Sequence, residues 1–404
     1  MVPSTIVILE SLPLTPTGKV DKRALPVPLN SSGSDTFVSP RNTVELQLVH
    51  IWSKILKIDD IGVKDNFFDL GGHSLLAPYL IAQIKQQFGK DIPLAILFQH
   101  PTIEDLASVL QKDLDASSWS PLVAIQPIGS NPPFFCFSGA GGYPFYLYKL
   151  ARGLGSDQPF YSFQTQSRDG ELAAIRQVED IAAKYLEAIQ AVQPQGPYFL
   201  GGHSFGGKVA FETAQQLRSQ GEEVALVAIF DTLAPIALAK PEEMDDVNLL
   251  ISIAKISQMT FTKDLEMDPE PLRSLAPDEQ LQYVLDYFKI LDILSPDAYT
   301  ITYLKRLMQA FKADNKAFYE YVPQQINPIP ITLFRASEYY QQEPPEIQNS
   351  GLSQDLAWGW SAFSSVPVNI QFVPGNHTTM MNQPHVQILV ERLKACIQQA
   401  QANI

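Results

Sequence analysis

The sequence is poor in cysteine, in positive charge and in long apolar runs, and each shortage excludes a class of protein. Two cysteines in 404 residues cannot form a disulfide framework, which favours a reducing compartment such as the cytoplasm. The net charge of −14 argues against partners such as nucleic acid or an anionic membrane surface. No apolar run is long enough to cross a bilayer, and the first residues lack the layout of a secretory signal. We therefore expect a cytoplasmic protein that binds neither nucleic acid nor membrane.

Two stretches with few large apolar residues divide the chain. Residues 26–40 are rich in proline, serine and glycine, which is typical of a flexible linker. Residues 113–132 are polar and then punctuated by prolines, so we interpret them as a second linker. The remainder forms a short segment at 1–25, a small module at 41–112 and a large domain at 133–404. The chain is too long for one ordinary domain, and 45% hydrophobic residues are ample for several cores.

The small module has the pattern of a helical bundle. Leu48, Trp52 and Ile55 share one face of an amphipathic segment, and residues 74–89 contain a second such segment. Thr102 has the position of an N-cap for a third helix. We therefore expect a small four-helix-bundle domain, too small and polar-faced to hold an enzymatic cavity of its own.

In the large domain, continuous apolar strands alternate with helical segments, which predicts a mostly parallel sheet covered on both faces. In its middle, the apolar strand at 197–200 leads into GGHSFGG at 201–207 and then into a helix that ends at Gly221. Strand, Gly-x-Ser-x-Gly and helix in this order are typical of the nucleophile turn of the α/β-hydrolase fold. We therefore predict that fold, with Ser204 as the nucleophile.

A serine hydroxyl needs a base, and histidine is the usual one. His377 follows the last predicted strand, at the carboxyl end where catalytic residues gather, whereas His385 lies at the start of the final helix. His203 precedes the nucleophile, and the sharp turn would point it away from Ser204. We choose His377, with His385 as the alternative. For the acid that orients the base, the residues leave two candidates that each end a strand, Asp231 and Glu338.

Two further features of the large domain bear on catalysis. The glycine loop SGAGG at 138–142 follows the first strong strand, which is where this fold supplies one amide of an oxyanion hole. By position, the two backbone donors are Ala140 and Phe205. The acidic, aromatic-rich helical insertion at about 235–325 is a candidate lid over a substrate cleft; the alternative is a helical subdomain packed for stability.

Residues 65–74, DNFFDLGGHS, closely resemble the signature of peptidyl carrier proteins. The resemblance implies that Ser74 receives the covalent cofactor 4′-phosphopantetheine from a phosphopantetheinyl transferase. One departure is Pro78, which removes an amide early in the following helix. At the N-terminus, residues 13–21 resemble the closing motif of a nonribosomal peptide synthetase adenylation domain. The rest of that domain is absent, so we interpret 1–25 as its C-terminal remnant, in which Lys19 has no nucleotide to contact.

The order Ser204, Asp231, His377, with SGAGG ahead, resembles the type I thioesterase domains that end peptide synthetases. This resemblance implies Asp231 as the acid in place of Glu338. Together the three motifs imply that upstream synthetase modules load a peptidyl or acyl chain onto the Ser74 arm. Ser204 would take over that carrier-bound thioester and release the chain by hydrolysis or macrocyclisation. The alternatives are a general esterase fused to a carrier, and a docking module without catalytic activity.

Overall fold

The computed structural model describes residues 37–58, 60–72, 76–90, 92–111, 120–142, 144–164, 177–236, 245–261, 267, 269–290, 301–324, 326–338 and 352–404. The predictions for segment 1–25 with its Lys19, for most of the linker 26–40 and for Ser74 lie outside these residues.

The N-terminal module is the expected helical bundle. Its described helices are α1 (Thr43–Leu56), α2 (Leu76–Phe88), α3 (Ile96–Gln99) and α4 (Ile103–Gln111). Thr102 caps α4 as predicted, because its hydroxyl oxygen accepts a hydrogen bond from the Asp105 N–H at 3.2 Å. The core is centred on Trp52 and Phe67, whose rings meet edge to face at 5.1 Å. Pro78 lies inside α2 without breaking it.

The large domain is built on one mixed sheet. Its strands in the described part of the chain are β1 (Leu122–Gln126), β2 (Phe134–Phe137), β3 (Phe160–Phe163), β4 (Tyr198–His203), β5 (Val224–Phe230), β6 (Ile331–Ala336) and β7 (Asn369–Val373). The spatial order is β1-β3-β2-β4-β5-β6-β7. All pairings from β3 to β7 are parallel, and β1 pairs antiparallel with β3 at the edge. The segments that follow β2, β4, β5 and β7 therefore meet at the same edge of the sheet.

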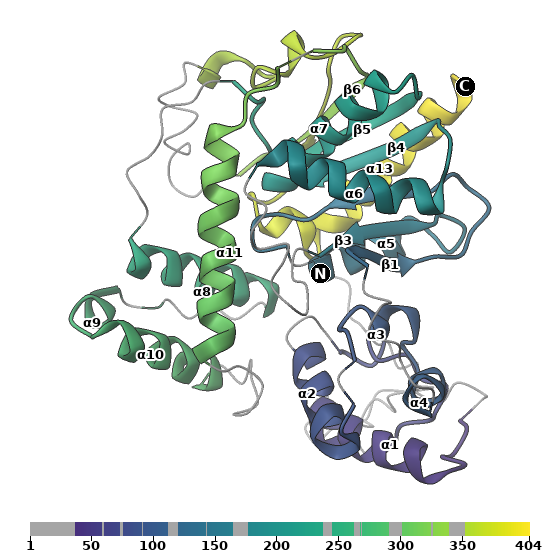
Figure 1. Cartoon of the computed structure of the whole chain (residues 1–404), viewed down its shortest axis with the longest axis vertical. Helices are drawn as coiled ribbons and strands as arrows, with labels where there is room; N and C mark the ends of the chain where they lie inside the picture. The colour runs from purple at the N-terminus through teal and green to yellow at the C-terminus, as the bar shows by residue number, and fades with distance from the viewer. Residues whose placement is uncertain are drawn as a thin grey trace, which may run out of the picture.

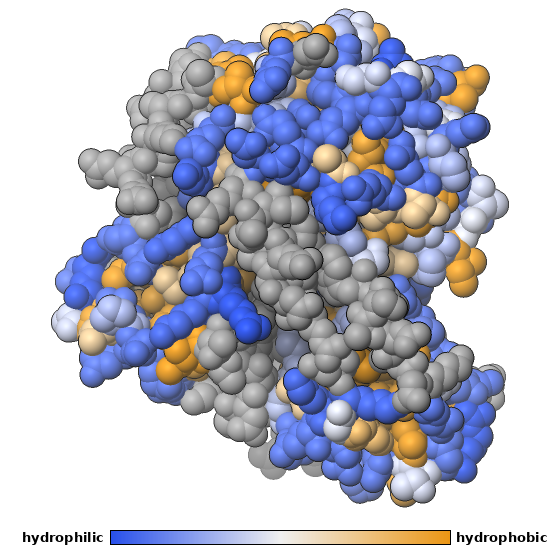
Figure 2. Space-filling view, viewed as in Figure 1, coloured by the Kyte–Doolittle hydropathy of each residue, from blue (hydrophilic) through white to orange (hydrophobic). Residues whose placement is uncertain are grey.

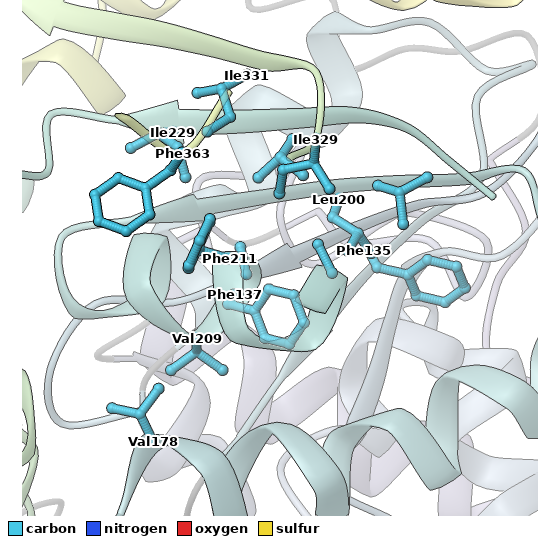
Figure 3. Packing of buried hydrophobic residues seen from close by; sticks show 14 of the residues in the cluster. Phe135, Phe137, Val178, Leu200, Val209, Phe211, Ile229, Ile329, Ile331 and Phe363 are labelled. Atoms are coloured by element: carbon cyan, nitrogen blue, oxygen red, sulfur yellow. The ribbon is translucent and has the colours of Figure 1, made fainter. Parts of the chain in front are cut away.

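Helices cover both faces of this sheet. One core lies under α6 (Val178–Val192) and α7 (Phe205–Ser219), and the other lies under α5 (Tyr148–Gly153) and α13 (His385–Ala402). Figure 3 shows part of the first core, where residues of β2, α7 and β5 such as Phe137, Val209 and Ile229 lie together. Burial of these apolar faces leaves the described part of the surface in Figure 2 mostly hydrophilic. This confirms the α/β-hydrolase architecture.

A helical insertion separates β5 from β6. It contains α8 (Asp246–Phe261), α9 (Pro269–Arg273), α10 (Pro277–Ile290) and α11 (Ile301–Glu320). These helices bury a cluster of their own, with Leu250, Val284 and Leu304 at its centre. In Figure 1, α8, α9 and α10 lie beside the sheet domain, and the long helix α11 runs back along it. The predicted insertion is therefore present, and its separate core would also suit a stabilising subdomain.

One element was missed by the sequence analysis. Part of the predicted linker 113–132 is strand β1, which pairs with β3 and buries Val123 and Ile125. The flanking prolines and serines hid a run of only five residues. In the described part of the chain, no helix is both long and apolar enough to span a bilayer.

Candidate active site

Ser204 lies at the sharp bend between β4 and α7. Its backbone has φ 56° and ψ −125°, a conformation that non-glycine residues rarely adopt. Close packing requires glycine two residues later: a Cβ on Gly206 would lie 2.3 Å from the carbonyl oxygen of Phe137. The Thr232 hydroxyl donates to the carbonyl oxygen of Ser204 at 2.8 Å. These contacts hold the serine at the carboxyl edge of the sheet.

Asp231 and His377 come together at the same edge. The Nδ1 atom of His377 lies 2.8 Å from Oδ2 of Asp231, whose other oxygen accepts the Ala336 N–H at 2.8 Å. Burial by itself would raise the pKa of Asp231, but the hydrogen bond and charge of His377 hold it below its usual value. Because an ionised carboxylate only accepts hydrogen bonds, Nδ1 carries the proton and Nε2 remains as the basic nitrogen.

The residue before Ser204, His203, contacts His377 of this pair. His203 directly precedes Ser204, and its ring stacks on the ring of His377 with centroids 4.7 Å apart. Among the described residues, no hydrogen bond joins the Ser204 hydroxyl to His377. Such catalytic hydrogen bonds often tighten only when substrate binds.

The alternative acid and base lie apart from this pair. The carboxylate of Glu338 accepts a hydrogen bond from the Gly375 N–H at 3.3 Å. His385 is the first residue of α13 and packs beside Gly375, where a Cβ would come within 2.9 Å of its ring. The geometry therefore favours Asp231 and His377 over both alternatives.

The glycine loop forms a tight turn at 139–142 beside Ser204. The turn is closed by a 3.2 Å hydrogen bond between its end residues, and Gly141 has a φ of +86° that favours glycine. A Cβ on the first glycine would lie 3.4 Å from Cβ of Ser204. The amide of Ala140 thus belongs to a turn that contacts Ser204. The amide of Phe205 is the first in α7, where N–H groups have no partner inside the helix.

Helix α11 of the insertion contacts both the turn and α7. Asp314 accepts a hydrogen bond from the Gly141 N–H at 2.8 Å through its Oδ2 atom. One turn further along α11, the carbonyl oxygen of Phe318 accepts a hydrogen bond from Nζ of Lys208 at 2.6 Å. The insertion is therefore attached to the elements that position Ser204 and Ala140.

Ser74 lies outside the described residues, but the signature in front of it contacts the large domain. The ring of Phe68 lies 4.5 Å from that of Tyr148 on α5, and it stacks on Phe98 at 4.6 Å. The guanidinium of Arg152 lies 4.0 Å from the Asp69 carboxylate. In Figure 1, the module accordingly lies against the α5 and β1 end of the sheet.

The sequence analysis missed two side chains that contact the turn, Tyr146 and Asp314. The Tyr146 hydroxyl accepts a hydrogen bond from the Gly139 N–H at 2.8 Å, and Asp314 contacts the turn from 173 residues away. No function was predicted for His203 from the sequence, although its ring stacks on that of His377 in the structure. The glycine loop indicates that its amides need partners, but no local pattern identifies a partner as distant in the sequence as Asp314.

Two family models match the chain, one in each domain. A thioesterase domain model matches residues 132–397, and a phosphopantetheine attachment site model matches residues 47–110. The second match includes Ser74.

Curated relatives match along nearly the whole chain. Chondramide synthase cmdD of Chondromyces crocatus is 34% identical over 98% of this chain, which covers 10% of that protein. Indigoidine synthase of Dickeya dadantii (strain 3937) is 31% identical over 96% of this chain, which covers 25% of that protein. The chain thus spans a quarter or less of the length of these relatives.

One solved structure matches nearly the whole chain, and another matches the large domain. A crystal structure of a holo four-domain nonribosomal peptide synthetase bound to AMP and glycine matches 98% of this chain and 29% of its own, at 30% identity and a TM-score of 0.61. The Vlm2 thioesterase domain, solved with a dodecadepsipeptide, matches 70% of this chain and 98% of its own at 21% identity and a TM-score of 0.50, which shows the fold alone. The chain therefore belongs to the thioesterase domain family, and its thioesterase domain follows a phosphopantetheine-binding carrier domain in the arrangement of nonribosomal peptide synthetases.

Proposed function

We propose that this chain ends peptide synthesis by moving a peptidyl or acyl chain from a carrier thioester on Ser74 to Ser204 and then releasing it. The acceptor in the second step is water, or an amine or hydroxyl of the chain itself. The observation that carries the proposal is the hydrogen-bonded pair of Asp231 and His377 at the edge of the sheet where the strained bend presents Ser204.

In this proposal, His377 is the general base. Its Nε2 atom removes the proton of the Ser204 hydroxyl as that oxygen attacks the thioester carbonyl, and the same nitrogen returns the proton to the departing thiol. Asp231 keeps the proton of the imidazole on Nδ1 and stabilises the imidazolium that forms. In the second step, His377 activates the incoming water, amine or hydroxyl in the same way.

The amides of Ala140 and Phe205 stabilise the negative charge on the tetrahedral intermediate. Both belong to segments that contact Ser204, so they need little reorganisation as the charge develops. Loss of one such donor typically lowers the rate by roughly 10²–10³-fold. The turn is fixed by side chains of other elements, so substitutions there test the donors indirectly.

The residues around the Ser74 loop fit a phosphopantetheine arm. A Cβ on Gly71 would meet nothing within 4 Å, so the loop leaves room for a modifying enzyme, while Phe67 anchors it in the core. Once attached to Ser74, 4′-phosphopantetheine would supply the thiol that carries the substrate as a thioester. The contact between the carrier signature and α5 places the two domains together, which favours delivery within one chain.

The proposal implies two kinds of partner, upstream synthetase modules that supply the chain and a phosphopantetheinyl transferase that modifies Ser74. It also places the reaction in the cytoplasm. Both cysteines are free, and burial raises the pKa of Cys136, so neither side chain depends on an oxidising compartment.

The proposal is tested with octanoyl coenzyme A and a phosphopantetheinyl transferase. The wild-type chain should gain one octanoyl arm and then release octanoate, whereas Ser74→Ala should gain none. Ser204→Ala should gain the arm and retain it. Free octanoyl N-acetylcysteamine thioester, which needs no carrier arm, serves as the comparison substrate for the activity of the large domain alone.

Two results would contradict the proposal. Release of octanoate by Ser204→Ala at the wild-type rate would leave the large domain as a docking module. Hydrolysis of simple esters that far exceeds turnover of the carrier-bound thioester would indicate a general esterase fused to a carrier.

A further inference from the structure

Three hydrogen bonds connect the turn at 139–142, which contains the proposed oxyanion donor Ala140, to the backbone of His377. We call this segment the oxyanion turn. The Gly139 N–H donates to the Tyr146 hydroxyl oxygen at 2.8 Å. That hydroxyl lies 3.0 Å from Nδ1 of His203, and Nε2 of His203 lies 2.8 Å from the carbonyl oxygen of His377. The chain of contacts runs from the loop after β2, through the end of β4, to the loop after β7.

The Gly139 N–H can only donate and the His377 carbonyl oxygen can only accept, which fixes the position of each hydrogen in these three hydrogen bonds. The carbonyl oxygen of His377 can only accept, so Nε2 of His203 carries the hydrogen that lies between them. In neutral His203 the other nitrogen, Nδ1, is then an acceptor, and the Tyr146 hydroxyl must donate to it. The hydroxyl oxygen of Tyr146 is left to accept the Gly139 N–H, so each group has one role.

His203 stays neutral in this arrangement. Its residue is 6% exposed, and burial, with a further contribution from the nearby charge of His377, lowers the pKa of His203 to about 3. Burial also raises the pKa of the Tyr146 hydroxyl, which therefore keeps its proton. His203 is therefore neutral and the Tyr146 hydroxyl is protonated at neutral pH, as these hydrogen bonds require.

We propose that His203 and Tyr146 are positioning residues, which hold the His377 backbone and the oxyanion turn at a fixed separation. The inference rests on the proposed roles of Ser204 and His377. Attack on the thioester needs the base on one side of Ser204 and the turn amide on the other. The stacking of the His203 and His377 rings, tilted by 29°, adds a second restraint on the base.

The first test is Tyr146→Phe in the full chain, which removes one hydroxyl and little volume. We expect kcat for octanoyl N-acetylcysteamine thioester to fall about 10- to 100-fold, because displacement of reacting groups by about 1 Å has effects of this size. KM should change less than about twofold, because the hydroxyl points to His203 and Gly139. The matched control is Tyr161→Phe on β3, which should keep the wild-type kcat and melting temperature.

The second test compares two substitutions of His203. His203→Gln keeps an N–H at about the reach of Nε2, whereas His203→Leu has a similar volume and no donor. We expect Gln to retain about tenfold more kcat than Leu at comparable melting temperatures. Equal loss in both variants, or a wild-type kcat in Tyr146→Phe, would overturn the proposal.

A third test uses the wild-type chain and measures the protonation of His203 directly, so it remains valid if the variants fold poorly. Nitrogen NMR of ¹⁵N-histidine-labelled wild-type chain should show His203 with its hydrogen on Nε2 and no titration between about pH 5 and 9. A hydrogen on Nδ1, or protonation near neutral pH, contradicts the proposal.

Labelling of Ser204 by a fluorophosphonate separates this proposal from the proposed function. If the reagent fails to label Ser204 in the wild-type chain, the proposed function fails. If it labels the wild type and Tyr146→Phe equally fast, only the positioning role fails.

Discussion

At the scale of single residues, the choice between two carboxylates decides how His377, the proposed base, is held. Both Asp231 and Glu338 follow strands of the sheet, and the residues by themselves do not separate them. Only Asp231 contacts the imidazole in the structure, because its oxygens divide between Nδ1 of His377 and the Ala336 N–H. Glu338 instead accepts the Gly375 N–H and supports the loop that carries His377.

Asp231→Asn should lower kcat for octanoyl N-acetylcysteamine thioester by about 10³–10⁴-fold, because an amide at this place no longer selects the Nδ1–H tautomer. Glu338→Gln can still accept the Gly375 N–H and should keep kcat within about threefold of the wild type. Steady-state kinetics of both variants at matched melting temperatures measure the difference. A large loss in Glu338→Gln with a small loss in Asp231→Asn would reverse the assignment.

How much of the site the sequence predicts depends on how local each contact is. The bend at Ser204 is encoded within seven residues, and His377 is recognisable from its place after a strand. The contacts of Tyr146 with His203 and of His203 with His377 join residues 57 and 174 positions apart. Such pairs follow from the order of strands in the sheet, which the sequence pattern does not give.

At the scale of elements, polar side chains of α7 connect the insertion to the sheet domain through hydrogen bonds. Lys208, Glu212 and Gln215 are buried on one side of this helix and bond to Phe318, Tyr321 and Asn327. These side chains lie three or four residues apart, on the same side of the helix that the sequence predicts after the bend. Buried polar groups need partners, and here the C-terminal end of α11 and the chain after it supply them.

Asp314 should make this attachment depend on pH. Burial raises its pKa to about 7, although the Gly141 N–H opposes the rise; Tyr185 on α6 is the neighbouring titratable side chain. Because the folded pKa lies above the unfolded value, Asp314 contributes stability that is present below about pH 4 and is lost as pH rises through about 7.

Asp314→Asn keeps an acceptor for Gly141 and removes the titration. The free energy of unfolding of the wild type should fall between pH 5 and pH 8 as Asp314 ionises, whereas that of the variant lacks this loss. The difference between the two chains should therefore shift in favour of the variant by about 2–3 kcal/mol between pH 5 and pH 8. Thermal melts of both chains at the two pH values measure the change. A difference between the chains that is the same at pH 5 and pH 8 would show that Asp314 is ionised throughout.

The strands show where the patterns of elements succeed and fail. The parallel strands from β2 to β6 are largely buried apolar runs, and their pattern predicts them. Strand β1 is short, and its place is set by antiparallel pairing with β3 at the open edge. Pairing of this kind depends on a partner that lies 34 or more residues further along the chain, so local composition indicated a linker.

At the scale of the whole molecule, the carrier domain meets the thioesterase domain through its own signature. Phe68, six residues before Ser74, stacks on Phe98 of the carrier and also contacts the ring of Tyr148 on α5. Ala95 and Phe98 share a buried cluster with residues of β1 and α5. The contact therefore joins the two domains through aromatic and apolar side chains.

Phe68→Ala and Tyr148→Ala should each slow release from the octanoyl arm about 3- to 10-fold, the range expected for an aromatic pair. Hydrolysis of free octanoyl N-acetylcysteamine thioester should stay within about twofold of the wild type, because it needs no docking. The double variant should be no slower than the slower single variant, since both remove the same contact. Additive losses, or equal losses on the free thioester, would show that the rings act through stability and not through docking.

The most direct measurement follows one octanoyl group through the chain. After loading of Ser74, samples are quenched at short times and the modified peptides are identified by mass spectrometry. The group should appear first on the Ser74 arm and then as an ester on Ser204, and in Ser204→Ala it should stay on the arm. An ester on any other residue, or wild-type loss of the group from the arm of Ser204→Ala, would contradict the account.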